Sequence, residues 1–276
     1  MKLSLLFILF TISFAGCNQE PSPYEKMAKV ISGPYHSGGY VPLVSELNPG
    51  LKINEAYEIQ KHFVRTILNN DDIAGYKTGL ASKKAQSNYF VDNPISGVLF
   101  KSGEYNDNSE IKFTEYFTML VETELGFRIG EEINKPINNV KELDSKISAI
   151  IPVIELPDVR FTEFKNSKLT DVVAANICSS KFVKGKESDF KKSGSQDIDI
   201  QLKLDGNTIN TVSIADSMEY QKELLIWLIN QQLENGWEIK PGQILITGAM
   251  GKINIGRPGL YEADYGQLGK VKFKVR

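Results

Sequence analysis

The stretch Met119–Gly130, M-L-V-E-T-E-L-G-F-R-I-G, decides the fold, because its apolar residues surround two acids that are two positions apart. Successive side chains of a β-strand point to opposite faces, so on a strand Glu122 and Glu124 would point to the same side. Two neighbouring carboxylates repel each other unless a cation lies between them, and hard divalent ions such as Mg²⁺ or Mn²⁺ prefer oxygen ligands. A third acid, Glu155, lies in a second apolar run at 149–156. The sequence therefore predicts a site of three carboxylates, although an E-x-E pair on a strand is usually a solvated face.

The composition of the chain narrows the function classes. Its 276 residues carry a net charge of −2, with 24% charged and 41% hydrophobic residues, which is ordinary for a soluble globular protein of one large or two small domains. A pI of 5.9 without a basic cluster argues against nucleic acid as a partner. The two histidines, His36 and His62, are too few for a histidine-rich zinc site and make Ser-His-Asp catalysis improbable.

The amino terminus has the pattern of an export signal. After Lys2, the apolar run at 3–14 is too short to span the roughly 30 Å hydrocarbon core of a membrane as a helix. The run ends in F-A-G-C at 14–17, and Cys17 stands where bacterial lipoprotein signals carry their lipid-modified cysteine. That resemblance implies acylation of Cys17. A lipidated Cys17 leaves Cys178 without an intramolecular partner, so we expect no disulfide even in an oxidising compartment.

The same resemblance divides the chain and predicts its location. Residues 1–16 would be removed as a lipoprotein signal peptide, 17–23 would form a tether, and 24–276 a single domain. Asn18 is not the aspartate that often retains such proteins at the inner membrane. We therefore expect a protein of the cell envelope, on the periplasmic side of the outer membrane, that meets the membrane only through its N-terminal lipid.

Local patterns predict an α+β chain whose middle is rich in strands. Predicted helices are 24–32, 53–68 with apolar residues at i, i+3 and i+4, part of 140–150, and a helix from a capping box at Asp216 and Glu219 to a stop at Gly236. Predicted strands are 111–116, 118–129, 151–156, a hairpin of 198–204 and 208–212 around Asp205-Gly206, 243–247 and 270–275.

Two glycine-containing segments are predicted to be irregular. Residues 33–39 are expected to form a loop. In 75–80, Lys77 lies between two glycines that let the backbone approach a ligand, although a turn with an exposed lysine is the commoner outcome.

An ordered set of motifs covers residues 24–276. They are P-L-V-S-E-L at 42–47, A-Y-E-I-Q at 56–60, G-Y-K-T-G-L-A-S at 75–82, V-E-T-E at 121–124, I-P-V-I-E-L-P-D-V-R at 151–160, D-V-V-A-A-N-I-C-S-S-K-F-V-K-G at 171–185, W-L-I-N-Q-Q-L-E-N-G at 227–236, I-L-I-T-G-A at 244–249 and Y-G-Q-L-G-K-V at 265–271. The set resembles the 2-keto-4-pentenoate (2-hydroxypenta-2,4-dienoate) hydratases and 4-oxalocrotonate decarboxylases of the fumarylacetoacetate hydrolase superfamily. Those proteins carry G-x-K-I-G-L-T-S, E-x-E, P-A-x-E-I-x-D-S-R and D-T-x-A-D-N-x-S-S-x-x-F-V-x-G in the same order.

The resemblance implies a fold, a cofactor and a substrate class. The implied fold is a β-rich α+β domain with curved mixed sheets around a metal site, a helical N-terminal part and assembly as a homo-oligomer. Mg²⁺ or Mn²⁺ on Glu122, Glu124 and Glu155 would chelate a 2-hydroxy-dienoate or 2-oxo acid. Lys77 would hold the substrate carboxylate or transfer a proton. Weaker candidates are the substrate contacts Ser82, Ser180 and Thr247 and a supporting pair behind the metal ligands, Asp158 and Arg160.

Two positions depart from the family pattern. P-I-S-G at 94–97 places Ile95 where the family has an acid suited to proton transfer, and Ala175 replaces a second acid. Three functions remain open: a metal-dependent hydratase or decarboxylase, a C–C bond hydrolase acting on an acylpyruvate, and an anchored protein that binds a 2-oxo acid or metal without turnover. The relatives usually work in the cytoplasm on intermediates of aromatic degradation, which contrasts with the export signal.

Overall fold

The computed structural model describes residues 20–193, 198–214 and 217–276 of the chain. The predicted signal peptide, Cys17 and Asp216 of the predicted capping box lie outside these residues. The helices are α1 (Pro23–His36), α2 (Val44–Leu47), α3 (Ile53–Leu68), α4 (Lys83–Asn88), α5 (Val140–Lys146), α6 (Leu169–Ala174), α7 (Phe190–Ser193) and α8 (Ser217–Glu234). The strands are β1 (Ile73–Gly79), β2 (Ile95–Phe100), β3 (Glu104–Asn106), β4 (Ser109–Ile111), β5 (Leu120–Ile129), β6 (Ile147–Leu156), β7 (Lys181–Lys184), β8 (Ser188–Asp189), β9 (Ile198–Leu204), β10 (Asn207–Ile214), β11 (Ile244–Ile246), β12 (Asn254–Ile255), β13 (Gly259–Asp264) and β14 (Lys270–Val275).

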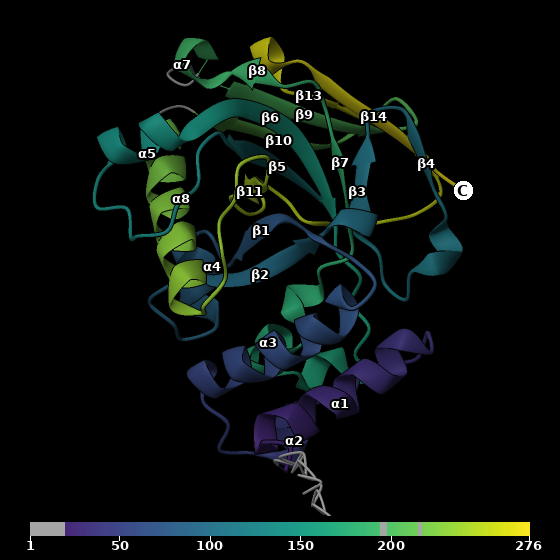
Figure 1. The fold of residues 1–276 in the computed structure, drawn as a ribbon. Coiled ribbons are helices and arrows are strands. Elements are labelled where there is room, and N and C mark those ends of the chain that lie inside the picture. The colour runs from purple at the N-terminus through teal and green to yellow at the C-terminus, as the bar shows by residue number, and fades with distance from the viewer. Residues whose placement is uncertain (1–19, 194–197, 215–216) are drawn as a thin grey trace, which may run out of the picture.

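A mixed sheet forms the centre of the molecule, and its strand order is β2-β1-β11-β5-β6-β7-β3. The long strands β5 and β6 pair antiparallel, and β6 curves over the upper part of the molecule (Figure 1). β1 and β11 pair in parallel although about 170 residues separate them in the chain. The predicted strands at 118–129 and 151–156 are thus confirmed as the two central strands.

A second sheet, of order β10-β9-β13-β14-β4, packs against the first through a shared apolar core. Its β9–β10 pair is the predicted hairpin, with Asp205 at φ 49° and Gly206 at φ 81° in the turn. Tyr261 and Phe273 stack in this core with ring centroids 4.9 Å apart. Burial of apolar side chains from both sheets is the main source of stability here.

The helices form two groups. α1, α2, α3 and α6 gather at one end of the molecule around their own apolar cluster, and α8 lies beside β1, β2 and β11 (Figure 1). The apolar cluster of the first group also contains Ile95 and Ile177, so it reaches the ends of β1 and β2. The helical end and the central sheet therefore meet where Lys77 and the three glutamates lie.

Several local predictions are wrong at their boundaries. α1 continues through 33–36, where a loop was predicted, because Pro34 stands in the last turn and the Ser37 amide still reaches the Gly33 carbonyl. The predicted strand 111–116 is limited to the end of β4, and residues 113–115 form a turn of 3₁₀ helix. The predicted helical part of 140–150 ends at Lys146, and β6 begins at once.

The prediction for 75–80 is corrected most. This segment is the buried strand β1 rather than a turn or a ligand-binding loop. Gly75 is needed because a Cβ there would lie 1.8 Å from the Ile244 carbonyl oxygen of β11. The glycine therefore serves the approach of two strands, and Lys77 is buried instead of exposed.

Two further observations concern the N-terminal predictions. Cys178 carries a free thiol among the described residues, and because Cys17 lies outside them, the expected absence of a disulfide stays a prediction. Among the helices that the structure describes, none is long and apolar enough to cross a bilayer.

Candidate metal centre

The three predicted glutamates lie together on β5 and β6. The antiparallel register places Glu122 directly opposite Glu155, and Glu124 lies on the same face two residues further along β5. One carboxylate oxygen from each of them lies within 4.8 Å of the others. Glu124 and Glu155 are fully buried, whereas Glu122 keeps partial access to solvent. The predicted three-carboxylate cluster is therefore present inside the protein.

The hydrogen bonding of the cluster fits a bound cation. Within the described part of the chain, Glu124 Oε1 and Glu155 Oε2 are buried without any hydrogen-bond partner. Buried carboxylate oxygens normally have partners, because leaving them unpaired costs about 1–3 kcal/mol or more. An all-oxygen set of three carboxylates is the ligand chemistry that Mg²⁺ and Mn²⁺ favour. The residues present thus fit a hard divalent ion.

The electrostatics of the cluster agree with this. Burial and the charge of Glu155 raise the pKa of Glu122 to about 7. Burial, followed by the charges of Glu155 and Glu122, raises the pKa of Glu124 well above its ordinary value. The protein environment therefore disfavours full ionisation of the three carboxyl groups, and a bound cation would favour their ionised forms.

Lys77 supplies one positive charge to the cluster. It projects from β1, is 3% exposed, and its Nζ contacts Glu155 Oε1 and donates to the Ile177 carbonyl at 3.3 Å. Burial alone lowers the pKa of Lys77, but the charges of the three glutamates outweigh burial and raise it above its ordinary value. One ammonium beside three ionised carboxylates does not balance their charge, so the ionised cluster is net negative.

Two groups that the sequence patterns did not single out support the cluster. The Gly248 amide donates to Glu124 Oε2 at 2.8 Å, and this residue has φ 94° and a Cβ position only 2.6 Å from the Ala81 Cβ. The buried Tyr265 hydroxyl accepts from the Glu124 amide at 3.3 Å and donates to the Val153 carbonyl at 2.5 Å. The available signals were the matched segments I-L-I-T-G-A, which contains Gly248, and Y-G-Q-L-G-K-V, which begins with Tyr265.

The weaker substrate candidates lie in three different settings. Ser82 is exposed, and its Oγ accepts from the Ala85 amide at 3.1 Å as the N-cap of α4. Thr247 is buried after β11, with its Oγ1 3.4 Å from the Leu125 carbonyl. Ser180 lines a small cavity between the helical end and the sheets. Their roles as substrate contacts stay predictions.

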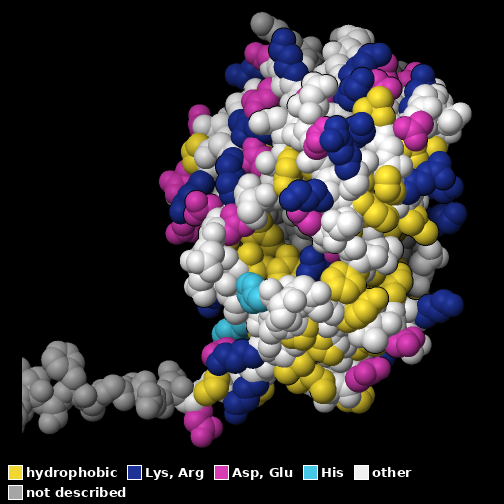
Figure 2. Space-filling view, turned by 90° about the vertical axis from the view of Figure 1, so that its right-hand side faces the viewer, with side chains coloured by type: hydrophobic (Ala, Val, Ile, Leu, Met, Phe, Trp, Pro, Cys, Tyr) yellow, Lys and Arg dark blue, Asp and Glu magenta, His cyan; other side chains and the backbone are white. Residues whose placement is uncertain are grey.

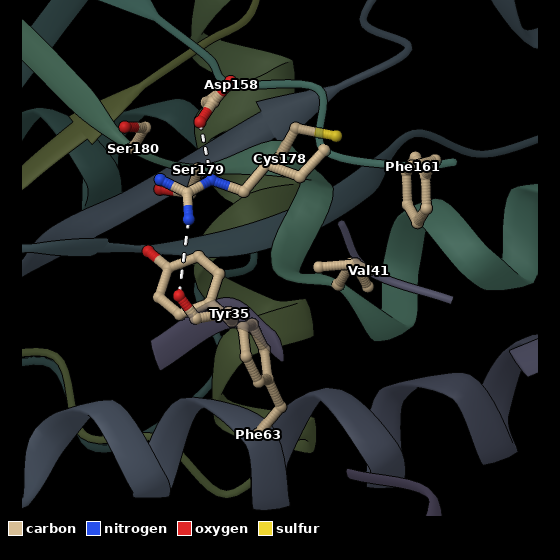
Figure 3. A pocket seen from close by; sticks show the side chains of 10 residues that line it. Tyr35, Val41, Phe63, Asp158, Phe161, Cys178, Ser179 and Ser180 are labelled. Carbon is tan, nitrogen blue, oxygen red and sulfur yellow. Dashed lines mark hydrogen bonds and ion pairs between the residues drawn. The ribbon is translucent and has the colours of Figure 1, made fainter. Parts of the chain in front are cut away.

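Asp158 and Arg160 brace the end of β6. Asp158 Oδ1 accepts from the Phe117 and Thr118 amides at 2.8 and 3.1 Å, and Oδ2 pairs with Arg160 Nε at 2.6 Å. The Arg160 guanidinium lies 4.8 Å from the centre of the Tyr35 ring. The pair thus joins the start of β5, the end of β6 and α1, and it lies beside Ser180 in the cavity of Figure 3.

A groove on the surface adjoins this cavity. Tyr35 and Arg160 line both the cavity and the groove, whereas His36 and Lys181 line the groove but not the cavity. Figure 2 shows a hollow on this side of the molecule with a basic side chain inside it and hydrophobic side chains around it. The boundary between the helical end and the sheets is therefore hollowed near the cluster.

One of the two departures from the family pattern, Ile95, lies on the same face of the sheet as Lys77. Ile95 pairs with Gly79 across β1 and β2, two residues along from the pairing of Lys77 with Gly97, so it occupies the same face. It is 3% exposed and packs in the apolar cluster that contains Ile177 and Ala175. The chain thus presents an apolar wall on this side of the ammonium.

These features define a class of protein. Curved mixed sheets with a helical end, enclosing three glutamates and a lysine, form a fumarylacetoacetate-hydrolase-like fold of the α+β class. No family model matches the chain.

Individual relatives agree with the class. The chain is 24% identical over 255 residues to 2-keto-4-pentenoate hydratase of Paraburkholderia xenovorans (strain LB400), covering 91% of this chain and 94% of that protein. It is 22% identical over 212 residues to 4-oxalocrotonate decarboxylase of Pseudomonas sp. (strain CF600), covering 76% and 80%. These relatives support the family resemblance of the motifs.

Solved structures share the fold. 4-Oxalocrotonate decarboxylase from Pseudomonas putida G7, complexed with magnesium and adipate, has a TM-score of 0.84 at 20% identity, covering 92% of this chain and 97% of that chain. Fumarylpyruvate hydrolase from Pseudomonas aeruginosa, in complex with Mn²⁺ and pyruvate, has a TM-score of 0.54 at 15% identity over 72% of this chain and 88% of that chain. Both neighbours hold a divalent metal.

Proposed function

We propose that this chain is a divalent-metal-dependent lyase, a hydratase or decarboxylase, that acts on a 2-hydroxy-dienoate or 2-oxo acid such as 2-keto-4-pentenoate. The observation that carries the proposal is the cluster of three carboxylates with two buried, unpaired oxygens beside the buried ammonium of Lys77. The names of the relatives identify the reaction class. Glu122, Glu124 and Glu155 would hold Mg²⁺ or Mn²⁺.

The chemistry divides between the cation and the chain. When bound, the cation stabilises the negative charge that develops on the substrate's enolate oxygen, which contributes several kcal/mol to transition-state stabilisation. Lys77 attracts the substrate carboxylate and donates a hydrogen bond or a proton from Nζ. The apolar wall at Ile95 and Ile177 excludes water from one side of the ammonium.

Apart from the three glutamates, which are the proposed metal ligands, few of the described residues near Lys77 are able to move a proton. Ile95 has no titratable group, and burial raises the pKa of the Cys178 thiol to about 12, so this thiol stays protonated at neutral pH. The raised pKa of Lys77 depends on the negative charge of the glutamates, and neutralising that charge lowers it. Lys77 is therefore the residue of this chain that we assign to proton transfer.

The direct test follows the loss of dienol absorbance of 2-hydroxypenta-2,4-dienoate and the release of CO₂ from 4-oxalocrotonate. We expect turnover with Mg²⁺ in one of the two assays, loss of turnover with EDTA, and recovery when Mg²⁺ is restored. Glu124→Ala is expected to abolish turnover, whereas Glu131→Gln, at an exposed carboxylate, serves as the matched control. Neither product appearing with a well-folded, Mg²⁺-loaded protein contradicts the lyase proposal.

A binding protein without turnover is the second candidate, and Ile95 and Ala175 favour it because both replace acids of the family pattern. Isothermal titration that shows tight oxalate binding only with Mg²⁺, together with no turnover on either substrate, supports this candidate. A C–C bond hydrolase acting on acylpyruvates is the remaining alternative, and cleavage of acetylpyruvate by the purified protein tests it.

The N-terminal segment completes the proposal. We propose that Cys17 is lipidated and that the protein is anchored at the periplasmic side of the outer membrane, because F-A-G-C follows a short apolar run. Mass spectrometry of the protein from its native host is expected to show a chain that begins at an acylated Cys17. An intact Met1 contradicts it. Assembly as a homo-oligomer is likewise a proposal, and light scattering of the purified protein tests it.

A further inference from the structure

A left-handed turn lies next to the catalytic lysine. Asn176, Ile177 and Cys178 have φ values of 55°, 51° and 53°, and Ile177 has ψ 41°. Left-handed backbone costs about 1–2 kcal/mol for each L-residue and is rarest for β-branched residues such as isoleucine. Three such residues in a row persist only where the surrounding structure enforces them, and strain of this kind gathers at functional sites.

Asn176 enforces the turn by binding an edge strand. Its side chain is 1% exposed, accepts from the Val98 amide at 2.8 Å and donates to the Val98 carbonyl at 2.9 Å. Val98 belongs to β2, which among the described strands is the edge of the central sheet, with no strand paired to its outer backbone groups. The carboxamide therefore pairs with β2 as another strand would, and it fixes the turn relative to the sheet.

The turn directs one carbonyl group toward the Lys77 ammonium and another toward the backbone after β6. The Ile177 carbonyl accepts from Lys77 Nζ at 3.3 Å, and the Cys178 carbonyl accepts from the Asp158 amide at 2.9 Å. Asp158 follows β6, which carries Glu155. One strained turn thus contacts β2, the ammonium on β1 and the end of the metal-binding strand.

Resting on the proposed function, we propose that Asn176 is a positioning residue for Lys77 and acts through the Ile177 carbonyl. A lysine ammonium has three N–H groups. Glu155 and the Ile177 carbonyl take two of them, which leaves the third for a ligand at the glutamates. With right-handed backbone at Ile177 its carbonyl would point elsewhere, and the ammonium would lose the acceptor that fixes its rotation.

The test is a double-mutant cycle of Asn176→Gly with Lys77→Ala. Glycine tolerates left-handed φ, so Asn176→Gly removes the contact with Val98 without adding strain. We expect kcat/KM to fall roughly 10- to 100-fold and oxalate affinity to fall with it, because the misplaced ammonium both transfers the proton and attracts the substrate carboxylate. In the Lys77→Ala background, Asn176→Gly is expected to cause no further loss, because both changes remove the same positioned ammonium.

The same four proteins are compared by their oxalate affinity in the presence of Mg²⁺. This measurement gives a result even where turnover is undetectable. Crystal structures provide a readout independent of activity: the Lys77 Nζ–Ile177 O contact is expected to be lost in Asn176→Gly. If this variant does not fold, Asn176→Asp, which keeps the acceptor for the Val98 amide, enters the same cycle. Losses that multiply in the double variant, or an unchanged Lys77 contact, overturn the proposal.

A matched control isolates the effect of left-handed strain itself. Phe90 also has left-handed backbone, at φ 54°, but is 96% exposed. Phe90→Gly is expected to leave kcat and oxalate affinity unchanged. If the wild-type protein binds Mg²⁺ and oxalate without turnover, the proposed lyase function is wrong. The role of Asn176 is then still tested by the oxalate affinities of the variants.

Discussion

At the scale of single residues, the ionised carboxylate of Glu124 destabilises the folded protein when no metal is bound. Burial raises the pKa of this carboxyl, so the folded state disfavours its ionised form. The contribution of Glu124 to the free energy of unfolding is therefore present at low pH and is lost as the pH rises above the ordinary pKa of a glutamate. We expect Glu124→Gln to stabilise the metal-free protein at pH 8 by about 1–3 kcal/mol, because a buried, unpaired charged oxygen disappears. Thermal unfolding in EDTA measures this, and the gain should shrink toward pH 5. A variant less stable than wild type at pH 8 contradicts the assignment.

Glu122 sets the pH dependence of metal binding. Its pKa of about 7 means that the metal-free site carries a proton below neutrality that the cation must displace. From Glu122 alone, the apparent Mg²⁺ affinity is therefore expected to rise roughly tenfold between pH 6 and pH 8, and deprotonation of Glu124 adds to this rise. Isothermal titration in buffers of different ionisation enthalpy measures the released proton. The Glu122→Gln variant should lose that proton release. A wild-type Mg²⁺ affinity that does not change with pH would contradict this role of Glu122.

At the scale of elements, the sequence predicted those helices and hairpins whose signals are local. The helix 53–68 and the hairpin around Asp205-Gly206 were correct, because amphipathic spacing and turn residues are local signals. The E-x-E spacing also predicted that two carboxylates share a face. The pairing of Glu122 with Glu155 depends on the register of β5 and β6, and the Gly248 amide comes from a loop 124 residues away from Glu124. No local pattern contains these long-range contacts.

Gly75 shows why β1 was misread, and it allows a prediction for that strand. A glycine suggests a turn in the sequence, but here it lets the backbones of β1 and β11 approach each other. Gly75→Ala places a Cβ 1.8 Å from the Ile244 oxygen, so we expect a loss of more than about 3 kcal/mol or insoluble protein. Gly33→Ala in α1, which has nothing within 4 Å, should be neutral or stabilise by up to about 1 kcal/mol. Equal melting temperatures for Gly75→Ala and wild type would contradict this account of β1.

At the scale of the whole molecule, metal binding should stabilise the fold far beyond the site. The ligands lie on β5 and β6 at the centre of the main sheet, and Lys77 joins them from β1, so the unfolded chain cannot present the same three carboxylates together. A ligand at 100 times its Kd that binds only the folded state adds about 2.7 kcal/mol, which for a chain of this size corresponds to a rise in Tm of roughly 5–10 °C. Scanning calorimetry with EDTA and with increasing Mg²⁺ or Mn²⁺ measures this rise, and Glu131→Gln should retain it while Glu124→Gln loses it. Ca²⁺ accepts longer bonds and more ligands than Mg²⁺, so the order of the three ions in this titration reports how tightly the sheet fixes the carboxylates. A Tm that does not respond to any of the three ions would mean that the unpaired oxygens of Glu124 and Glu155 do not form a metal site.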